Sequence, residues 1–482
     1  MSSPCILLEF NEISPTLLAR FMDEGKLPNF RRLHNESEVY VTDAEEAAPN
    51  LEPWIQWITA HCGLSYNEHG IFHLGDGHKL DRPSVWDILS RAGKSVWVCG
   101  SMNLNYDKGI NGAVLPDPWA IGVDPHPAEY EAYYKFVQRN VQEYTNDRVP
   151  LTRDDYIAFL RFMVSHGLSL ATVRAIVAQL IREAGGRQRW RRATILDKLQ
   201  WDVFRSYYKK HRPDFSTFFL NSTAHFQHMH WRNMDPSPFK VKPTEQEQAE
   251  FETAILYGYL EMDGIIGQCL SLAGRDATVI LASGLSQQPC LLYEDIGGKT
   301  FYRARELDRV LSFLGLTGEY TSFPVMSEEF HVRFTDERDA IAAEQRLAAV
   351  LVDGRSAMKV VRDGTNVFSG VRIHEHLDKD AKLTIAGTSV EAPFFRHFYK
   401  PEGTKSGMHH PDGVFWIRTL ERRHTVATES ASLRCVAPTL LDLFGIDAPA
   451  WMSGTSLFRG VTAPTFAYSP RTERTLATPT SV

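Results

Sequence analysis

The stretch 48–72 holds the residues of this 482-residue sequence that are most suited to chemistry. Pro49 and Pro53 fix the backbone φ angle, and each favours an extended residue before it. Asn50 is then predicted as the N-cap of a short helix that includes 54–59. The first turn of a helix presents unpaired N–H groups and the positive end of the helix dipole. Asn50 therefore marks a candidate site for an anionic group, such as the phosphoryl group of a substrate.

This stretch resembles the nucleophile segment of the alkaline phosphatase superfamily, above all its phosphodiesterase/nucleotide pyrophosphatase branch. In that branch a threonine nucleophile lies nine residues before a second threonine, and a His-Gly-Ile triplet follows. The sequence keeps this interval between Asn50 and Thr59 and continues with His69-Gly70-Ile71. An amide cannot form an alkoxide, so Asn50 cannot attack phosphorus as threonine, serine or cysteine would.

Further segments match motifs of the superfamily in the same order along the chain. They are the opening unit 25–33, the segment 228–231, the helix segment 259–267, the segment 407–414, and the terminal segments 436–445 and 452–454. The resemblance implies an α/β fold with a large, mostly parallel central sheet, helices on both faces and ligands at the carboxyl ends of the strands.

Members of the superfamily bind two divalent metal ions through carboxylates and histidines. Carried over position by position, the resemblance places residues without the family's chemistry at five positions: Asn11, Asn50, Ala224, Gly284 and Leu285. Only His228 and His409 keep the identity of metal ligands. Two dications would then lie close together with almost no compensating charge, so we do not expect the usual two-metal centre.

Two histidines and one carboxylate are sufficient to hold one divalent ion with open coordination positions. The sequence therefore predicts one metal site at most, for zinc or a similar ion, with His228 and His409 as ligands. Glu12 and Glu52 lie next to substituted positions, and either can supply the carboxylate or act as an acid or base. The candidate catalytic residues are Asn50, Glu12 and Glu52, and the candidate substrate-binding residues are Asn11 and Asn50.

Other polar residues near these segments have two interpretations each. His225, His230 and His410 are either additional ligands or side chains with solvent or backbone partners. The five arginines between 182 and 192 are either a solvated helix end or an anion-binding rim.

The elements that would position these residues follow from apolar runs and helix signals. Cys5–Phe10, Phe215–Leu220 and Ala277–Ala282 are predicted as buried strands. Ser14 and Pro15 begin a helix, and 337–352 is predicted as an amphipathic helix after the strand 329–334. The predicted division of the chain is a core (1–125, 213–297 and 392–460), a helical insertion (126–212), a small α/β subdomain (298–391) and a disordered tail (461–482).

Composition bounds the partners and the compartment. A hydrophobic content of 43% with 23% charged residues is ordinary for a globular protein, and a net charge of −7 argues against nucleic-acid binding. The six cysteines are scattered and read as reduced, and no apolar run is long enough to span a membrane. We therefore expect a cytoplasmic protein without a signal peptide, with a small anionic ligand and no nucleic-acid or membrane partner.

Three functional hypotheses remain open from the sequence. The first is a reorganised hydrolase or transferase that acts on a phosphorylated, sulfated or glycan-type substrate without the usual two-metal centre. The second is a catalytically inactive pseudoenzyme that binds an anionic ligand or partner. The third is an ordinary metal-dependent phosphodiesterase, which applies if the motif register is wrong and other residues supply the ligands.

Overall fold

The computed structural model describes residues 3–145, 151–186, 188–325, 328–401 and 404–458, so the predicted tail 461–482 lies outside the described residues. In these residues nine strands form one central sheet in the order β20-β2-β19-β6-β1-β5-β3-β4, and β21 pairs with β2. The strands are β1 (Cys5–Phe10), β2 (Glu38–Asp43), β3 (Val96–Cys99), β4 (Gly112–Leu115), β5 (Phe215–Leu220), β6 (Thr278–Ser283), β19 (Asp412–Arg418), β20 (Thr425–Val426) and β21 (Ala431–Ser432).

The sheet is mostly parallel, and β1 lies at its centre. β1 pairs in parallel with β5 and with β6, and β3 pairs in parallel with β4 and β5. β19 is the exception, because it runs antiparallel between β2 and β6. The carboxyl ends of β5, β1 and β6 therefore meet at one edge of the sheet, where α/β folds of this kind bind their ligands.

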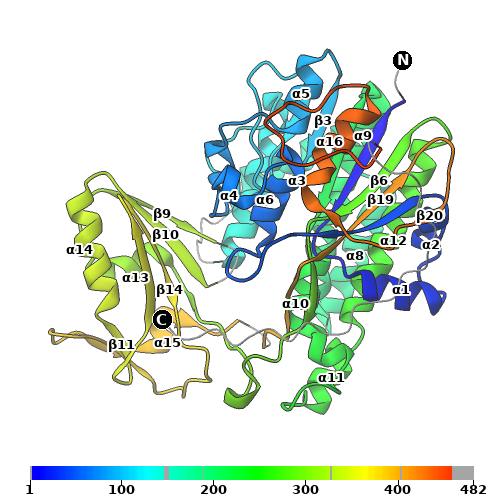
Figure 1. Ribbon diagram of the computed structural model, residues 1–482. Helices are drawn as coiled ribbons and strands as arrows, with labels where there is room; N and C mark the ends of the chain where they lie inside the picture. The colour runs from blue at the N-terminus through cyan, green and yellow to red at the C-terminus, as the bar shows by residue number, and fades with distance from the viewer. Residues whose placement is uncertain (1–2, 146–150, 187, 326–327, 402–403, 459–482) are drawn as a thin grey trace.

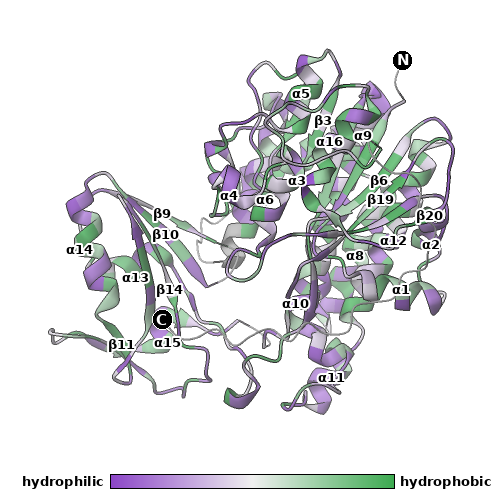
Figure 2. Ribbon diagram, viewed as in Figure 1, coloured by the Kyte–Doolittle hydropathy of each residue, from purple (hydrophilic) through white to green (hydrophobic). Residues whose placement is uncertain are grey.

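Both faces of the sheet are covered by helices, as Figure 1 shows. Alternate side chains of a strand point to opposite faces. Ile6 and Leu8 of β1 accordingly belong to one buried cluster and Cys5 and Leu7 to another. The first cluster includes side chains of α1 (Pro15–Asp23), α2 (Pro28–Asn35), α9 (Ala193–His211) and α12 (Ala254–Ala273), and the second includes side chains of α3 (Pro53–Cys62), α5 (Val85–Arg91) and α16 (Val436–Leu443). The hydropathy colours of Figure 2 show the central strands as predominantly apolar.

Helices dominate the stretch that the sequence predicts as an insertion. They are α6 (Glu131–Thr145), α7 (Arg153–Ser165), α8 (Leu170–Ala184) and the long α9, which also packs against β3 and β5. α6 and α7 are joined by stacked rings, since the centroids of Phe136 and Phe159 lie 3.9 Å apart. After β5 the chain forms α10 (Ser222–Met234) and α11 (Glu245–Phe251) before α12.

A smaller α/β unit with two four-stranded sheets stands beside the core (Figure 1). One sheet has the order β13-β14-β10-β9 and the other β12-β11-β15-β16. Its elements are α13 (Leu307–Phe313), β9 (Tyr320–Pro324), β10 (Glu329–Phe334), α14 (Glu337–Ala348), β11 (Val350–Val352), β12 (Arg355–Ser356), β13 (Met358–Asp363), β14 (Asn366–Val371), β15 (Lys382–Ile385), β16 (Glu391–Pro393) and α15 (Phe394–His397). Two short pairs, β8 (Arg303–Ala304) with β17 (Phe398–Tyr399) and β7 (Ser286–Pro289) with β18 (Gly407–His410), complete the strands.

The predicted fold class is confirmed, and most predicted elements lie where the sequence put them. β1 and β5 have the predicted bounds, and Ser14 caps α1 because its hydroxyl accepts a hydrogen bond from the Leu17 N–H. The prediction of one helix over 337–352 is wrong at its end. The helix stops at Ala348, since the β-branched Val350 and Val352 are buried as part of strand β11.

Candidate metal centre

The chain brings three side chains together just beyond the carboxyl end of β1. Glu12 follows β1 by two residues, and His228 lies on α10, which follows the neighbouring strand β5. His409 lies on β18, which pairs with β7 in a register that sets His409 opposite Gln287. β7 in turn follows β6, the other neighbour of β1. Three adjacent parallel strands thus deliver this group, which we call the Glu12 cluster.

The Glu12 cluster places one carboxylate and two imidazoles around a common point. Glu12 Oε2 lies 3.0 Å from His228 Nε2 and 3.5 Å from His409 Nε2. One ligand atom from each residue lies within 4.8 Å of the other two. The Glu12 side chain is buried, whereas His228 and His409 keep 21% and 14% of their side-chain surface exposed. The two histidine rings are therefore partly exposed, although the Nε2 atom of His409 is itself buried.

Both imidazoles are oriented by the backbone. His228 Nδ1 lies 3.3 Å from the Gly407 carbonyl oxygen, and His409 Nδ1 lies 2.8 Å from the Leu51 carbonyl oxygen. A carbonyl only accepts, so the proton of each neutral ring is on Nδ1 and the lone pair is on Nε2. Both Nε2 atoms face the carboxylate, and three acceptors then converge on a space that requires a cation or a proton. Such backbone anchoring is typical of histidines that bind metals.

Glu12 itself is held in an unusual backbone conformation. Its φ angle is +58°, in the left-handed region that side chains rarely adopt. The carbonyl oxygen of Glu12 accepts a hydrogen bond of 2.7 Å from Gln227, and Gln287 donates to its Oε2. Non-glycine residues in this region are concentrated at functional sites, where surrounding contacts hold them. The carboxylate is therefore fixed in place by its neighbours.

Electrostatics within the cluster shift the pKa values of Glu12 and His409 in opposite directions. Burial by itself would raise the pKa of Glu12, but His228 and His409 outweigh it and hold that pKa well below its ordinary value. Burial also lowers the pKa of His228 to about 4, with Glu12 only partly offsetting it. In His409, burial acts in the same direction, yet Glu12 and Glu52 together raise the pKa. Glu12 and His409 therefore each favour the charged form of the other.

The other side of the same edge is filled by amides, which we call the amide cluster: Asn11, Asn221 and the indole of Trp57. Trp57 Nε1 only donates, and it lies 2.8 Å from Asn11 Oδ1, which fixes the orientation of that amide. Asn11 Nδ2 therefore donates to Glu12 Oε1 at 3.0 Å and to Asn221 Oδ1 at 2.7 Å. The Asn11 amide thus presents an N–H donor, and not an anionic oxygen, beside Glu12.

The remaining positions carried over from the superfamily offer no ligand either. Gly284 has no side chain, and a Cβ there would lie 3.1 Å from the Cβ of Gln56. Leu285 is buried in a small apolar cluster with Ala44 and Leu51. The residues present therefore do not fit a two-metal centre, whereas the Glu12 cluster fits a single ion with two nitrogen ligands and one oxygen ligand.

The prediction that Asn50 caps the helix is wrong. The N-cap of α3 is Glu52, whose extended conformation (φ −127°, ψ 139°) follows from its position before Pro53. The Asn50 side-chain amide lies 3.4 Å from a Glu46 carboxylate oxygen, and the backbone carbonyl of Asn50 accepts from the Gln56 side chain. Glu52 Oε2 lies 3.6 Å from His409 Nδ1, with 30% of its side chain exposed, and burial of the carboxyl raises its pKa. Glu52, not Asn50, therefore borders the Glu12 cluster.

The additional histidines are not among the side chains whose ligand atoms converge in the Glu12 cluster. The ring of His230 stacks on Phe251 with centroids 4.5 Å apart, and His225 is exposed on α10. His410 points toward Asp412, with His410 Nδ1 at 3.9 Å from the carboxylate. Of the arginines after residue 182, Arg192 pairs with Glu183 and Arg191 lies over the ring of Tyr257. His230, His410, Arg191 and Arg192 thus each have a contact within the protein.

The sequence did not predict two residues that contribute to the site, Gln287 and Asn221. Gln287, in a segment without a recognised motif, donates both to Glu12 Oε2 and to the Ala224 carbonyl at 3.0 Å. Asn221 is the first residue after β5 and bonds to Asn11, whereas Ala224, the position taken from the motif, lies inside α10. Asn221 could have been found from the sequence, because the apolar run of β5 ends at Leu220 and the next residue therefore lies at the end of the strand.

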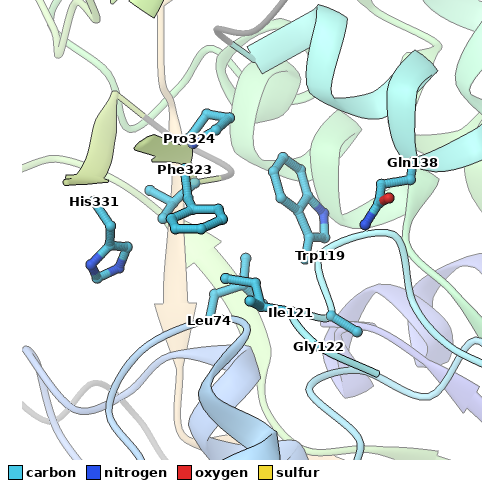
Figure 3. A pocket seen from close by; sticks show the side chains of 10 residues that line it. Leu74, Trp119, Ile121, Gly122, Gln138, Phe323, Pro324 and His331 are labelled. Carbon is cyan, nitrogen blue, oxygen red and sulfur yellow. The ribbon is translucent and has the colours of Figure 1, made fainter. Parts of the chain in front are cut away.

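A separate cavity of about 250 Å³ lies between the core and the small α/β unit. Figure 3 shows the rings of Trp119 and Phe323 on opposite sides of it, with Leu74 and Ile121 between them. His331 also lines it. None of its lining residues belongs to the Glu12 cluster, so the largely apolar cavity is not the candidate metal centre.

The described part of the chain contains no helix with both the length and the apolar character that crossing a membrane requires.

No protein-family model matches the sequence, and no curated protein matches it at the required significance. Solved structures are similar over most of the chain. Murine ectonucleotide pyrophosphatase/phosphodiesterase 5 aligns over 94% of this chain and 98% of its own, with 10% identity and a TM-score of 0.41. Phosphonoacetate hydrolase from Sinorhizobium meliloti aligns over 89% and 92%, with 12% identity and a TM-score of 0.38. At these values we take no chemistry from either protein.

Proposed function

We propose that this protein is a hydrolase of phosphorylated or sulfated esters that uses one divalent metal ion, of the zinc type, held by Glu12, His228 and His409. The observation that carries the proposal is the convergence of Glu12 Oε2 and the two Nε2 atoms within 4.8 Å of one another. The backbone partners of both Nδ1 atoms support it, because they leave the Nε2 lone pairs facing the same space. The motif resemblance to the alkaline phosphatase superfamily agrees with a hydrolytic reaction.

The residues around the centre suggest which group attacks the substrate. When bound, a divalent ion supplies Lewis acidity and lowers the pKa of water. Asn50 carries an amide and points to Glu46, so hydrolysis would proceed by direct attack of water without a covalent intermediate. Glu52 is the nearest partly exposed carboxylate, and we assign it the role of general base that accepts the proton of this water.

Positive charge near the centre favours an anionic substrate. The Lys405 ammonium contributes to the lowered pKa of His228 and acts on the carboxyl of Glu52. In the described part of the chain Lys405 has no ion-pair partner, and its ammonium lies 5.8 Å from the centroid of the Phe301 ring. Lys299 also acts on the carboxyl of Glu52, but its ammonium lies 3.6 Å from a Glu328 carboxylate oxygen. Lys405 is therefore the side chain that we assign to binding the anionic group of the substrate.

The test is turnover by protein loaded with a stated metal ion. Protein stripped with a chelator and reloaded with zinc or manganese is assayed on an aryl phosphate, an aryl phosphodiester and an aryl sulfate. We expect one class to be hydrolysed, the rate to follow metal occupancy, and Glu52→Gln to lower kcat by about 10²–10⁴-fold with metal binding retained. Metal binding without turnover on any class would contradict the proposed hydrolase.

A second candidate is a pseudoenzyme in which His409 keeps its proton and the protein binds an anion without reaction. The raised pKa of His409 and the amide of Asn50 favour it, because a proton then fills the place of the metal ion. It predicts that inorganic phosphate or sulfate raises the Tm by mass action while zinc does not. The same assay with the chelator-treated protein separates the two candidates.

A further inference from the structure

Helix α8 turns a stripe of large apolar side chains to solvent, whereas Ile176 on its other side packs against the core. Its buried residues are polar, namely Thr172 and Gln179. Its exposed large side chains are apolar: Leu170 (74% exposed), Val173 (37%), Val177 (50%), Leu180 (56%) and Ile181 (70%). A helix on the surface of a globular protein normally turns its apolar stripe to the core. We call these five residues the outward face of α8.

The spacing of the outward face shows that it is one continuous stripe. Residues 170, 173, 177, 180 and 181 recur at intervals of three and four, so they lie along one side of the helix. The buried side is satisfied without them, because Gln179 Nε2 donates to Glu183 and to the Gln188 carbonyl, each at 2.8 Å. The apolar stripe is thus not a core face that failed to find its partner inside the fold.

The preceding helix adds further exposed apolar side chains. Tyr156, Leu160 and Val164 of α7 are 54%, 56% and 69% exposed, at intervals of four residues. Only the short segment 166–169 separates α7 from α8. Among the described residues, this helical stretch therefore gathers a large share of the apolar side chains that the molecule leaves open to solvent.

The charges on α8 indicate the chemistry of what covers it. Arg174 and Arg182 are exposed, and no ion pair to either occurs among the described residues. The one acid of the helix, Glu183, is taken by Arg192. The free charge beside the outward face is therefore positive, although the whole chain has a net charge of −7. An apolar stripe flanked by arginines matches a surface that is apolar below and anionic above.

We propose that the outward face of α8 binds the surface of an anionic lipid bilayer. The 15-residue helix would lie in the plane of the headgroups with its apolar side chains among the acyl chains. Arg174 and Arg182 have stems long enough to reach the lipid phosphates from there. This mode needs no spanning helix, so the absence of a spanning segment in the described residues does not bear on it.

A second copy of the chain fits this face less well. A two-fold dimer would bring the same patch of both copies together. Such an interface would gather the arginines Arg174 and Arg182 of both copies in one patch, while Glu183 is already paired and offers them no compensation. A bilayer supplies the missing negative charge, which is why we commit to lipid.

The test is flotation of the full chain with vesicles of phosphatidylcholine, with and without about 30% phosphatidylserine. We expect binding to the anionic vesicles, at least about tenfold less binding to the neutral ones, and a decrease at high salt. The double variant Val177→Glu/Ile181→Glu is expected to lose binding by more than about tenfold. Val361→Glu, at an apolar side chain that is 51% exposed in the small α/β unit, is the matched control and is expected to bind normally.

Each contrary result has a definite meaning. The lipid proposal is overturned if the unaltered chain does not bind anionic vesicles, or if the double variant binds them equally well. It is also overturned if sedimentation shows a dimer that the double variant abolishes, because a second copy then covers the face. Thermal unfolding checks that the variants are folded. Zinc binding is expected to be unchanged in them, so this proposal and the proposed function fail separately.

Discussion

The carboxyl edge of the central sheet carries two groups side by side that share Glu12 but differ in the atoms they present. The Glu12 cluster directs a carboxylate oxygen and two imidazole nitrogens at one space, and all three are acceptors. The amide cluster fills the adjoining space with donors, because the Asn11 amide nitrogen bonds to Glu12 Oε1 and Asn221 Oδ1. The contrast teaches that one edge of a sheet can present acceptors suited to a cation beside an amide that donates hydrogen bonds.

The largest expected effect comes from removing the charge of the Glu12 cluster. Glu12→Gln keeps the shape of the side chain but leaves two neutral ligands for a dication. Outer-shell changes cost about 10–100-fold in metal affinity, so we expect the loss of this direct ligand to exceed about 100-fold. Competition with a chromophoric chelator measures it. Glu46→Gln, near Asn50 but outside the cluster, is the control, and equal affinity in both variants would refute the assignment.

Placing an acid in the amide cluster should weaken the fold. Asn11→Asp would set a carboxylate oxygen against Glu12 Oε1 and Asn221 Oδ1, where the amide now donates two hydrogen bonds. We expect a loss of about 2–3 kcal/mol in the free energy of unfolding without metal, partly restored by zinc. Urea unfolding measures both. The exposed Asn67→Asp should change stability by less than about 0.5 kcal/mol. An unaltered stability of Asn11→Asp would mean that the amide contacts are not as described.

His230, on the same helix as His228, allows the Glu12 cluster to be compared with a histidine that is simply buried. Burial lowers the pKa of His230 to about 3, whereas the unfolded chain titrates near pH 6.5. The unfolded state therefore takes up a proton first, and stability falls as the pH drops below 6.5. We expect His230→Phe, which keeps the stacking on Phe251, to reduce the acid-induced loss by about 2 kcal/mol at pH 5. Urea unfolding at pH 5 and pH 8 tests this, and an identical pH dependence of the variant would contradict it.

The smallest effect is expected at Asn50. Its side-chain amide donates to Glu46, so neither Asn50→Ala nor Asn50→Thr should change kcat by more than about threefold, or about 0.6 kcal/mol. Steady-state rates on the substrate class that proves active check this. A large gain with threonine would show that the nucleophile position is still connected to the centre.

The fold was predictable because apolar runs and helix signals are local. Cys5–Phe10 and Phe215–Leu220 could be recognised as strands, since parallel strands buried on both faces are continuously apolar. The end of α14 was missed because a helical period and a short buried strand overlap in Val350–Val352. The start of α3 was misplaced at Asn50. Pro53 marks the correct start, because the residue before a proline favours the extended geometry of an N-cap.

The candidate site was predictable only in part. Glu12, His228 and His409 were selected as residues, but their approach to one point depends on the order of β5, β1 and β6 in the sheet, which no local pattern contains. The contribution of Gln287 depends on the pairing of β7 with β18, a contact between segments about 120 residues apart. The donors of the amide cluster likewise come from separate elements, and an asparagine gives no signal of its partner.

The most direct test of the account is the number of metal ions per chain. Protein dialysed against excess zinc and then freed of loose ions is measured by mass spectrometry of the metal and by titration calorimetry. The account predicts one zinc ion per chain at a site that Glu12→Gln abolishes. Two ions per chain would show that the amide cluster still holds metal, and none would show that the Glu12 cluster holds only a proton.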